Sequence, residues 1–174
     1  CHTLGLKKDG TIVHWGGHSE GQNKVPSPNR EFTAIAAGYI HSLGLKKDGS
    51  AVAWGRNSEG QCNVPSPNSE FTAIAAGYYH RLGLRKDGSI AAWGRNKRGQ
   101  CNVASANWEF AAVAAGSSHS LGLKKTGVIV AWGNNSAGEA TPPINLGKIK
   151  AVAAGAYFSV ALRDNGTVVA WGKN

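Results

Sequence analysis

Four histidines recur at a fixed spacing and are the residues best suited to metal chemistry. They are His2, His41, His80 and His119, each 39 residues from the next, and Phe158 takes the fifth place. Zinc needs imidazole nitrogens about 2.1 Å away, whereas equivalent positions on stacked sheets lie about 10 Å apart. One ion therefore cannot join two of these rings. We predict that the histidines are structural, that each bonds the backbone of a neighbouring loop, and that no metal is bound.

Thiol and carboxylate chemistry has little support in the sequence. Cys62 and Cys101 share the 39-residue spacing, which places them farther apart than the roughly 7 Å that a disulfide spans, so we expect free thiols. Cys1 stands alone. Four of the ten carboxylates lie in or beside predicted turns, at Asp9, Asp48, Asp87 and Asp164. Because no nucleophile motif or phosphate loop appears, we predict a protein that is not an enzyme and holds no cofactor.

Cations recur in the same register and could bind an anionic surface. The net charge is +9, and a regular set of cations lies beside the predicted turns at Lys7, Lys8, Lys46, Lys47, Arg85, Lys86, Lys124 and Lys125. Such a set could meet nucleic acid or an acidic protein. The segment lacks interleaved aromatic residues for base stacking. We therefore favour a solvated face and keep nucleic-acid binding as an alternative.

Tyrosine and arginine side chains stand at positions that differ between the repeats. They are Tyr39, Tyr78, Tyr79 and Tyr157 in one loop, and Arg56, Arg95 and Arg98 in another. Both residue types are enriched in the hot spots of protein interfaces. Positions that vary among near-copies are not needed by the repeat itself. We therefore predict that these residues bind a protein partner.

The repeat unit that positions these residues is 39 residues long. Trp-Gly pairs recur at that step, starting at Trp15, Trp54, Trp93, Trp132 and Trp171. We divide the single domain, residues 1–174, into repeats 2–40, 41–79, 80–118 and 119–157 and a partial repeat 158–174. The tryptophans are predicted to pack between adjacent units, where a large ring buries much apolar surface.

One unit is predicted to contain four short strands. In the unit 61–99 they are 61–64, 71–76, 80–85 and 89–93. Asp87-Gly88 between the last two indicates a two-residue type I′ turn. Four strands in about 40 residues are typical of a propeller blade, so the fold class predicted is an all-β propeller.

Antiparallel strands send successive connections to opposite faces of a blade. The Gly-x-x-His loops and the Trp-Gly-x-Asn loops, which carry the tyrosines and arginines, are expected on one face. The Lys-Lys-Asp-Gly hairpins and the Pro-Ser-Pro-Asn linkers are expected on the other.

The full motif is specific enough to indicate a family. The pattern Ala-Ala-Gly-x-x-His-Ser-Leu-Gly-Leu-Lys-x-Asp-Gly, continuing to Trp-Gly-x-Asn-x-x-Gly-Gln, stands nearly complete at 36–61 and 75–100. It resembles the regulator of chromosome condensation repeat, which implies a seven-bladed propeller. The short repeat without insertions is similar to bacterial members, one of which is a protein inhibitor of β-lactamases.

The length raises the question of how such a ring closes. The chain is 174 residues long, which is four units and 18 residues, and it begins with Cys1 rather than Met. We consider five blades with one incomplete, a segment of a larger ring, and chains that complete each other. We favour the segment.

These observations lead to a non-enzymatic protein-binding module as the predicted function. The resemblance adds two narrower alternatives, an inhibitor that caps a bacterial enzyme such as a β-lactamase and a chromatin-associated or nucleotide-exchange propeller. A purely architectural repeat is a further alternative. The sequence contains no stretch of about 18 apolar residues, which a membrane-spanning helix would need. No signal peptide is visible. The 24 glycines lack the three-residue period of collagen. The cellular compartment is left open.

Overall fold

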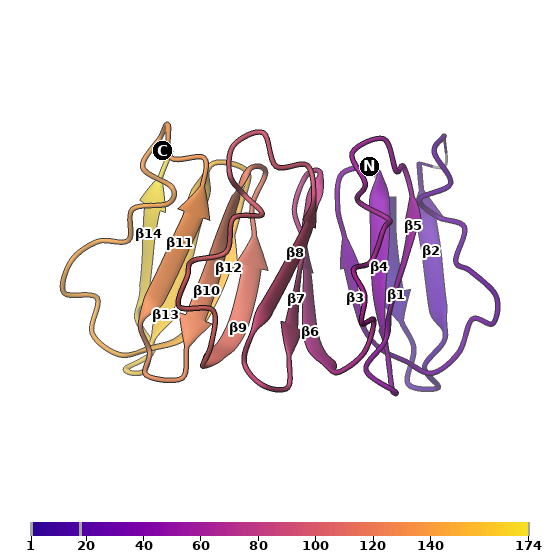
Figure 1. Ribbon diagram of the computed structural model, residues 1–174, viewed down its shortest axis with the longest axis horizontal. Coiled ribbons are helices and arrows are strands. Elements are labelled where there is room, and N and C mark those ends of the chain that lie inside the picture. The colour runs from indigo at the N-terminus through magenta and orange to yellow at the C-terminus, as the bar shows by residue number, and fades with distance from the viewer. Residues whose placement is uncertain (1, 18, 174) are drawn as a thin grey trace.

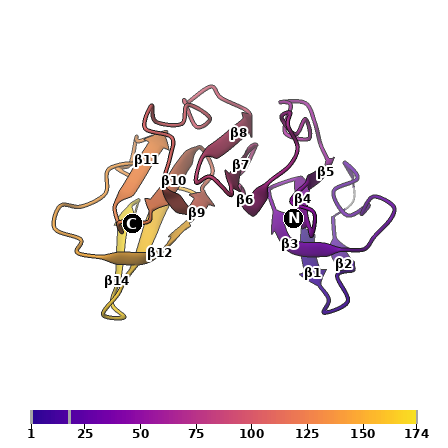
Figure 2. The ribbon, with the colours of Figure 1, turned by 60° about the horizontal axis from the view of Figure 1, so that its bottom comes forward.

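The computed structural model describes residues 2–17 and 19–173, which form β-strands and loops. Five antiparallel sheets follow one another along the chain, the first of two strands and the others of three. Figure 1 shows the sheets side by side in chain order, with β1–β2 and β12–β14 at opposite ends. Figure 2 shows that they follow an arc. Each sheet is one blade of a propeller, as the repeat predicts.

The strands repeat with the sequence. The first blade contains β1 (His2–Leu6) and β2 (Ile12–Gly16). The other blades contain β3 (Phe32–Ala37), β4 (His41–Lys46) and β5 (Ala51–Gly55); β6 (Phe71–Ala76), β7 (His80–Arg85) and β8 (Ile90–Gly94); β9 (Phe110–Ala115), β10 (His119–Lys124) and β11 (Ile129–Gly133); and β12 (Ile149–Ala154), β13 (Phe158–Arg163) and β14 (Val168–Gly172). Strands β3, β6, β9 and β12 contact one another in turn and form the inner side of the arc.

The prediction of a fourth strand in each blade is wrong. Residues 61–64 form turns, in which the Asn63 N–H donates to the Gly60 carbonyl (3.1 Å) and the Val64 N–H to the Cys62 carbonyl (3.1 Å). The Cys62 N–H donates to the side-chain oxygen of Asn57 (2.7 Å). These backbone donors are satisfied within the loop, so none is left for pairing with a neighbouring strand. The strands expected at 71–76 and 80–85 are confirmed, and the one expected at 89–93 is shifted by one residue.

The hairpin turns also differ from the type I′ turn expected. In the second blade Gly49 has a φ of 82°, whereas Asp48 does not have a positive φ, and the Gly49 N–H donates to the Lys46 carbonyl (3.0 Å). This is a longer loop in which a glycine with positive φ follows an ordinary turn. The Asp48 carboxylate accepts from the Ser50 N–H (2.9 Å) and hydroxyl (2.6 Å). That side-chain cap explains why Asp precedes the glycine.

The apolar core lies between blades. Leu43, Leu45 and Ala51 of the second blade are buried together with Phe71 and Trp93 of the third. Equivalent clusters occupy the other junctions between blades. Each blade therefore buries its face only against the next one, as in other repeat architectures.

The phenylalanine in three of these four clusters explains the Leu-Gly-Leu pattern. A bulge between Phe71 and Ala73 shifts the register of β6 against β7. The Phe71 ring then lies so close to Gly83 that a Cβ there would come within 2.5 Å of it. Only glycine leaves room for this ring.

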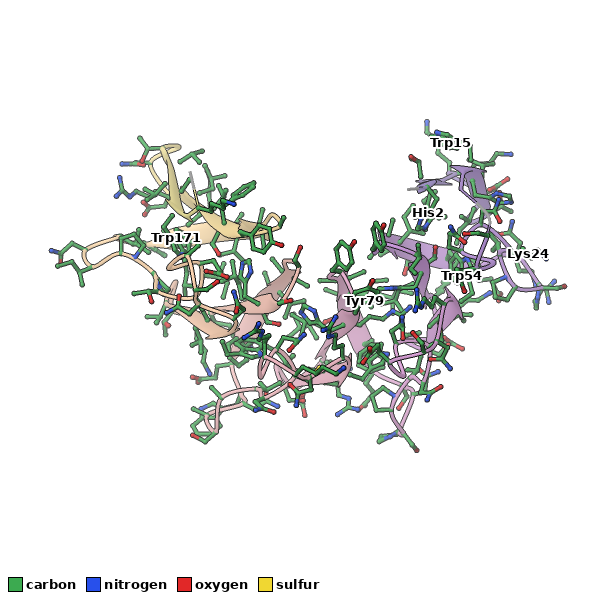
Figure 3. The ribbon with its side chains drawn as sticks, turned by 90° about the horizontal axis from the view of Figure 1, so that it is seen from above. His2, Trp15, Lys24, Trp54, Tyr79 and Trp171 are labelled. Carbon is green, nitrogen blue, oxygen red and sulfur yellow. The ribbon has the colours of Figure 1, made fainter. Side chains whose placement is uncertain are left out.

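The tryptophans of the inner blades join neighbouring blades. Trp54, Trp93 and Trp132 are buried, and the indole N–H of Trp132 donates to the Gln100 carbonyl of the preceding blade (2.9 Å). Trp15 lies in the first blade, and its side chain is 56% exposed. Figure 3 shows Trp15 at one tip of the arc, where no other sheet of the described residues covers it.

A chain of hydrogen bonds runs beside the tryptophan in three of the four junctions between blades, and we call it the serine latch. In one junction Nε2 of His80 pairs with the Ser120 hydroxyl of the next blade (2.9 Å), and this hydroxyl donates to the Gln100 carbonyl (2.9 Å). Because the hydroxyl proton goes to the carbonyl, the imidazole is the donor. The latch recurs with His2 and Ser42 (2.7 Å) and with His119 and Ser159 (3.0 Å). The histidine partner is thus a serine side chain, not the loop backbone that we expected.

The first testable prediction compares an inner tryptophan with the exposed one. Trp132→Ala removes a buried ring and the hydrogen bond to the Gln100 carbonyl. We expect a loss of about 3–5 kcal/mol in the free energy of unfolding, measured by urea denaturation. Trp15→Ala is the matched control and should lose less than about 1 kcal/mol. Equal losses from the two changes would contradict the placement of Trp132 between blades.

The second testable prediction concerns pH. Burial lowers the pKa of His80 to about 4 from the ordinary 6.5. Between these values the unfolded chain binds more protons, so this contribution to stability is complete above pH 6.5 and is lost as the pH falls towards 4. From pH ~7.5 to ~5 we expect His80 to account for a loss of about 2 kcal/mol in the free energy of unfolding.

His80→Gln is the control for this titration. The glutamine amide can donate to Ser120 but does not take up a proton in this range. Urea denaturation at the two pH values should show a smaller decrease for this variant. An unchanged decrease would assign the pH dependence to other groups.

Candidate binding faces

Backbone hydrogen bonds place the loops on two faces. The Arg56 N–H donates to the Ile40 carbonyl (3.0 Å) and the Arg95 N–H to the Tyr79 carbonyl (3.0 Å), so the loops after the inner and outer strands adjoin. We call this side, at the top in Figure 1, the tyrosine face. The Phe71 N–H donates to the Gly49 carbonyl (2.9 Å), which joins the linkers to the hairpins on the opposite, hairpin face.

Three of the four tyrosines form one cluster on the tyrosine face. The rings of Tyr39 and Tyr78 are stacked, with centroids 4.0 Å apart and planes 15° apart. Tyr79 meets the Tyr78 ring edge-on at 4.6 Å, and the guanidinium of Arg95 lies over the Tyr79 ring at 5.4 Å. These side chains come from two successive blades. Figure 3, which views the arc from above, shows Tyr79 on its concave side.

Two depressions adjoin this cluster. One lies where the inner strands end and is lined by short residues such as Gly77, Ala115 and Gly116 together with Tyr39 and Tyr78. The other is lined by Tyr78, Tyr79, Arg95, Ser117, Ser118 and Tyr157, and so extends the surface to the fourth tyrosine. The face therefore combines aromatic ridges with small-residue hollows.

The tyrosine face is partly exposed, and the Tyr78 phenol is neutral. Tyr39 is 40% and Tyr157 48% exposed, and Lys173 lies over the Tyr157 ring at 5.5 Å. The Tyr39 hydroxyl raises the pKa of Tyr78 to about 12, so that Tyr78 is neutral at physiological pH. Neutral phenols offer apolar area and a polar end at the same time.

The remaining predicted arginines lie apart from the aromatic contacts. The Arg56 guanidinium bends back and donates to the Ser58 hydroxyl of its own loop (2.8 Å). Arg98 is exposed on the loop that carries Arg95. Of the three arginines proposed from the sequence, Arg95 is the one that stacks on the tyrosines.

The predicted cations on the hairpin face fall into two groups, those that contact their own blade and those that are exposed. Lys46, Arg85 and Lys124 lie over the rings of phenylalanines of their own blades, at 4.0, 5.2 and 4.0 Å. Each also donates to linker carbonyls, as Lys124 does to that of Ala106 (2.7 Å). The other cations are exposed: Lys7, Lys8, Lys47, Lys86 and Lys125. The first group is therefore occupied in holding the blade together.

Several residues of structural importance were missed from the sequence. The serines of the latch and the buried Gln22, Gln61 and Gln100 were treated only as parts of the motif. A comparison of positions 39 residues apart could have shown that one blade differs, because Arg81 stands where Ser42 and Ser120 stand in other blades.

Neither a cluster of metal-ligand side chains nor a membrane-spanning helix is present among the described residues. Within 2–17 and 19–173, no group of three His, Cys, Asp or Glu side chains is placed to hold a metal ion. The same part of the chain contains no helix of the length and apolar character needed to cross a bilayer. Cys62 and Cys101 are free thiols, as expected, and Cys1 lies outside the described residues.

Solved structures share the propeller fold. Yeast RCC1 (Prp20) bound to Kap60 has a TM-score of 0.83 and is 24% identical, over 98% of this chain and 54% of that one. Prp20p from Saccharomyces cerevisiae gives 0.84 and 23%, over 98% and 56%. The ectodomain of the Physcomitrella patens receptor kinase CR4 gives 0.83 and 22%, over 98% and 49%. This chain thus spans about half the length of these proteins. A search of curated protein sequences finds no match.

The sequence itself matches a family description repeat by repeat. The pattern of the regulator of chromosome condensation (RCC1) repeat matches residues 32–61, 71–100, 110–139 and 149–174. Each match begins at or near the inner strand of a blade and continues into the loop after the outer strand or to the chain end. The matches cover more than half of the chain, which therefore belongs to the regulator of chromosome condensation (RCC1) repeat family.

Proposed function

We propose that this chain is a non-enzymatic module that binds a protein partner on its tyrosine face. The observation that carries the proposal is the cluster of Tyr39, Tyr78 and Tyr79 with Arg95 over its edge. Rigid aromatic rings with an adjacent guanidinium are the side chains that most often carry the binding energy of protein interfaces. They lose little conformational entropy on binding, because tyrosine has few rotatable bonds.

The shape of the face favours a macromolecule over a small ligand. The two depressions lie side by side and share Tyr78, and together they involve residues of several blades. A protein surface can cover such an extended area, whereas small ligands are usually held in deeper clefts. The residues at these loop positions differ between blades. The partner would therefore contact side chains that vary from blade to blade, on a backbone that repeats.

The hairpin face supports nucleic-acid binding less well. Three of its eight predicted cations are folded against phenylalanine rings and linker carbonyls. Asp48 and its in-phase equivalents place carboxylates beside the exposed lysines. Nucleic-acid affinity depends on cations that are free to neutralise phosphates.

Relatives support protein binding by propellers of this family. Yeast RCC1 is described bound to Kap60, and Prp20p is described with its binding properties to Gsp1p and histones. Those partners belong to those proteins. For this chain, enzyme capping, nucleotide exchange and a purely architectural role are kept as narrower or rival alternatives.

The test is a loss of binding from a double change. The immobilised chain is used to capture proteins from an extract of its host, and the captured partner is then purified for affinity measurements. Tyr78→Ala with Tyr79→Ala should weaken its affinity at least tenfold, because two hot-spot rings are removed. Trp108→Ala, which removes an exposed aromatic ring from a linker on the hairpin face, is the control and should change it less than about threefold.

Other results would favour a rival. Unchanged affinity after the double tyrosine change would move the contact elsewhere. Salt-sensitive binding to DNA that disappears with Lys47→Ala and Lys86→Ala would favour the basic face. Inhibition of a purified β-lactamase, abolished by the tyrosine changes, would select the enzyme-capping version.

A further inference from the structure

One junction between blades lacks the serine latch. Arg81 replaces the latch serine in the third blade, and its side chain is completely buried. Its Nη2 lies 3.4 Å from the Ser42 carbonyl oxygen and 3.7 Å from the Cys62 sulfur. Its Nε and Nη1 have no hydrogen-bond partner. Burial lowers the pKa of Arg81 to about 10, so the guanidinium remains charged at neutral pH.

The histidine of this junction has also lost its partner. His41 is completely buried, and neither of its ring nitrogens is hydrogen-bonded. Burial, with the Arg81 charge as the next cause, lowers the pKa of His41 to about 2, so the ring is neutral. The junction between the second and third blades therefore holds a buried cation whose only acceptors among the described residues are a carbonyl and a thiol. Such a charge is strongly stabilised when an anion is brought beside it.

The thiol beside Arg81 has an internal reference in the next repeat. Cys62 and Cys101 are both partly buried. The Cys62 sulfur contacts the Gly55 and Arg56 carbonyls at 3.6 and 3.3 Å. The Cys101 sulfur contacts the equivalent carbonyls at 3.9 and 3.4 Å. The two environments differ mainly in the neighbouring blade, which offers Arg81 in one case and a latch serine in the other.

We propose that Cys62 is an oxidation site for hydrogen peroxide and that its sulfenate supplies the anion that Arg81 lacks. In this step the Cys62 sulfur attacks one peroxide oxygen, an S–O bond forms and the O–O bond breaks. The departing hydroxide takes up the thiol proton and leaves as water. Sulfur is oxidised by two electrons, and the peroxide is reduced. The sulfenic proton then passes to solvent water, which leaves the sulfenate anion beside the guanidinium.

Two physical effects favour Cys62 over Cys101. The guanidinium stabilises negative charge that develops on sulfur during the attack, and it also stabilises the anionic product. Burial raises the pKa of the Cys101 thiol to about 11, which keeps that sulfur protonated and slow to react. Oxidation would thus strengthen one particular junction, next to the loop that carries Arg56.

The test measures oxidation at each cysteine separately. The folded chain is treated with hydrogen peroxide in the presence of dimedone, and labelled peptides containing Cys62 and Cys101 are quantified by mass spectrometry. We expect Cys62 to be labelled at least tenfold faster than Cys101. Arg81→Ser, which installs the residue of the other latches, should reduce this ratio to within about threefold of one. Equal rates in the native chain, or an unchanged ratio in Arg81→Ser, would overturn the proposal.

A mirror variant and a stability measurement complete the experiment. Ser120→Arg places an arginine in the corresponding junction and should accelerate labelling of Cys101 about tenfold. If that variant does not fold, the comparison of the native chain with Arg81→Ser still decides the question. Oxidation should also raise the urea midpoint of the native chain but not that of Arg81→Ser. A midpoint that falls in the native chain would contradict the pairing of the sulfenate with Arg81.

Discussion

The arrangement of the blades depends on one backbone carbonyl per junction, which accepts two hydrogen bonds from the next blade in two junctions and one in the other two. The carbonyl of Gln100 accepts from the Trp132 indole and from the Ser120 hydroxyl, both in the following blade. Glu139 repeats this role towards Trp171 and Ser159. An acceptor used twice by the next blade fixes both the separation and the angle of two sheets. Because no single blade has a core of its own, this contact and the apolar cluster beside it hold the arc together.

The same constraint leaves the loops on one face free to differ. The glutamine side chain closes its own loop, since Gln61 accepts from the Glu59 N–H (2.7 Å). Its backbone carbonyl then serves the neighbour. With the blade frame satisfied in this way, residues such as Tyr78, Tyr79 and Arg95 lie outside the buried apolar clusters between blades. They can therefore form a surface that is irregular although the frame is regular.

Arg81 illustrates what happens when a position within the frame varies. The serine of the latch is small, neutral and able to donate and accept at once, whereas a guanidinium can only donate. The consequence is a buried His41 without a hydrogen-bond partner and a buried charge that has no anion beside it among the described residues, only a carbonyl and a thiol. Lys46 and Lys124 also have a structural role within the blade. Their ammonium groups lie over phenylalanine rings and donate to linker carbonyls.

The sequence alone determined the repeat, the all-β propeller and the strands 71–76 and 80–85, because a 39-residue period and alternating side chains are properties of the chain order itself. It also separated the varying tyrosines from the constant tryptophans. It did not determine the number of strands, because the loop at 61–64 satisfies its own donors through contacts that no pattern displays. Only the tertiary structure decided that Trp15 is exposed while Trp132 is buried, and that Arg81 faces Cys62. Those outcomes depend on which surface the neighbouring blade presents, and identical motifs in one chain acquire different environments from different neighbours.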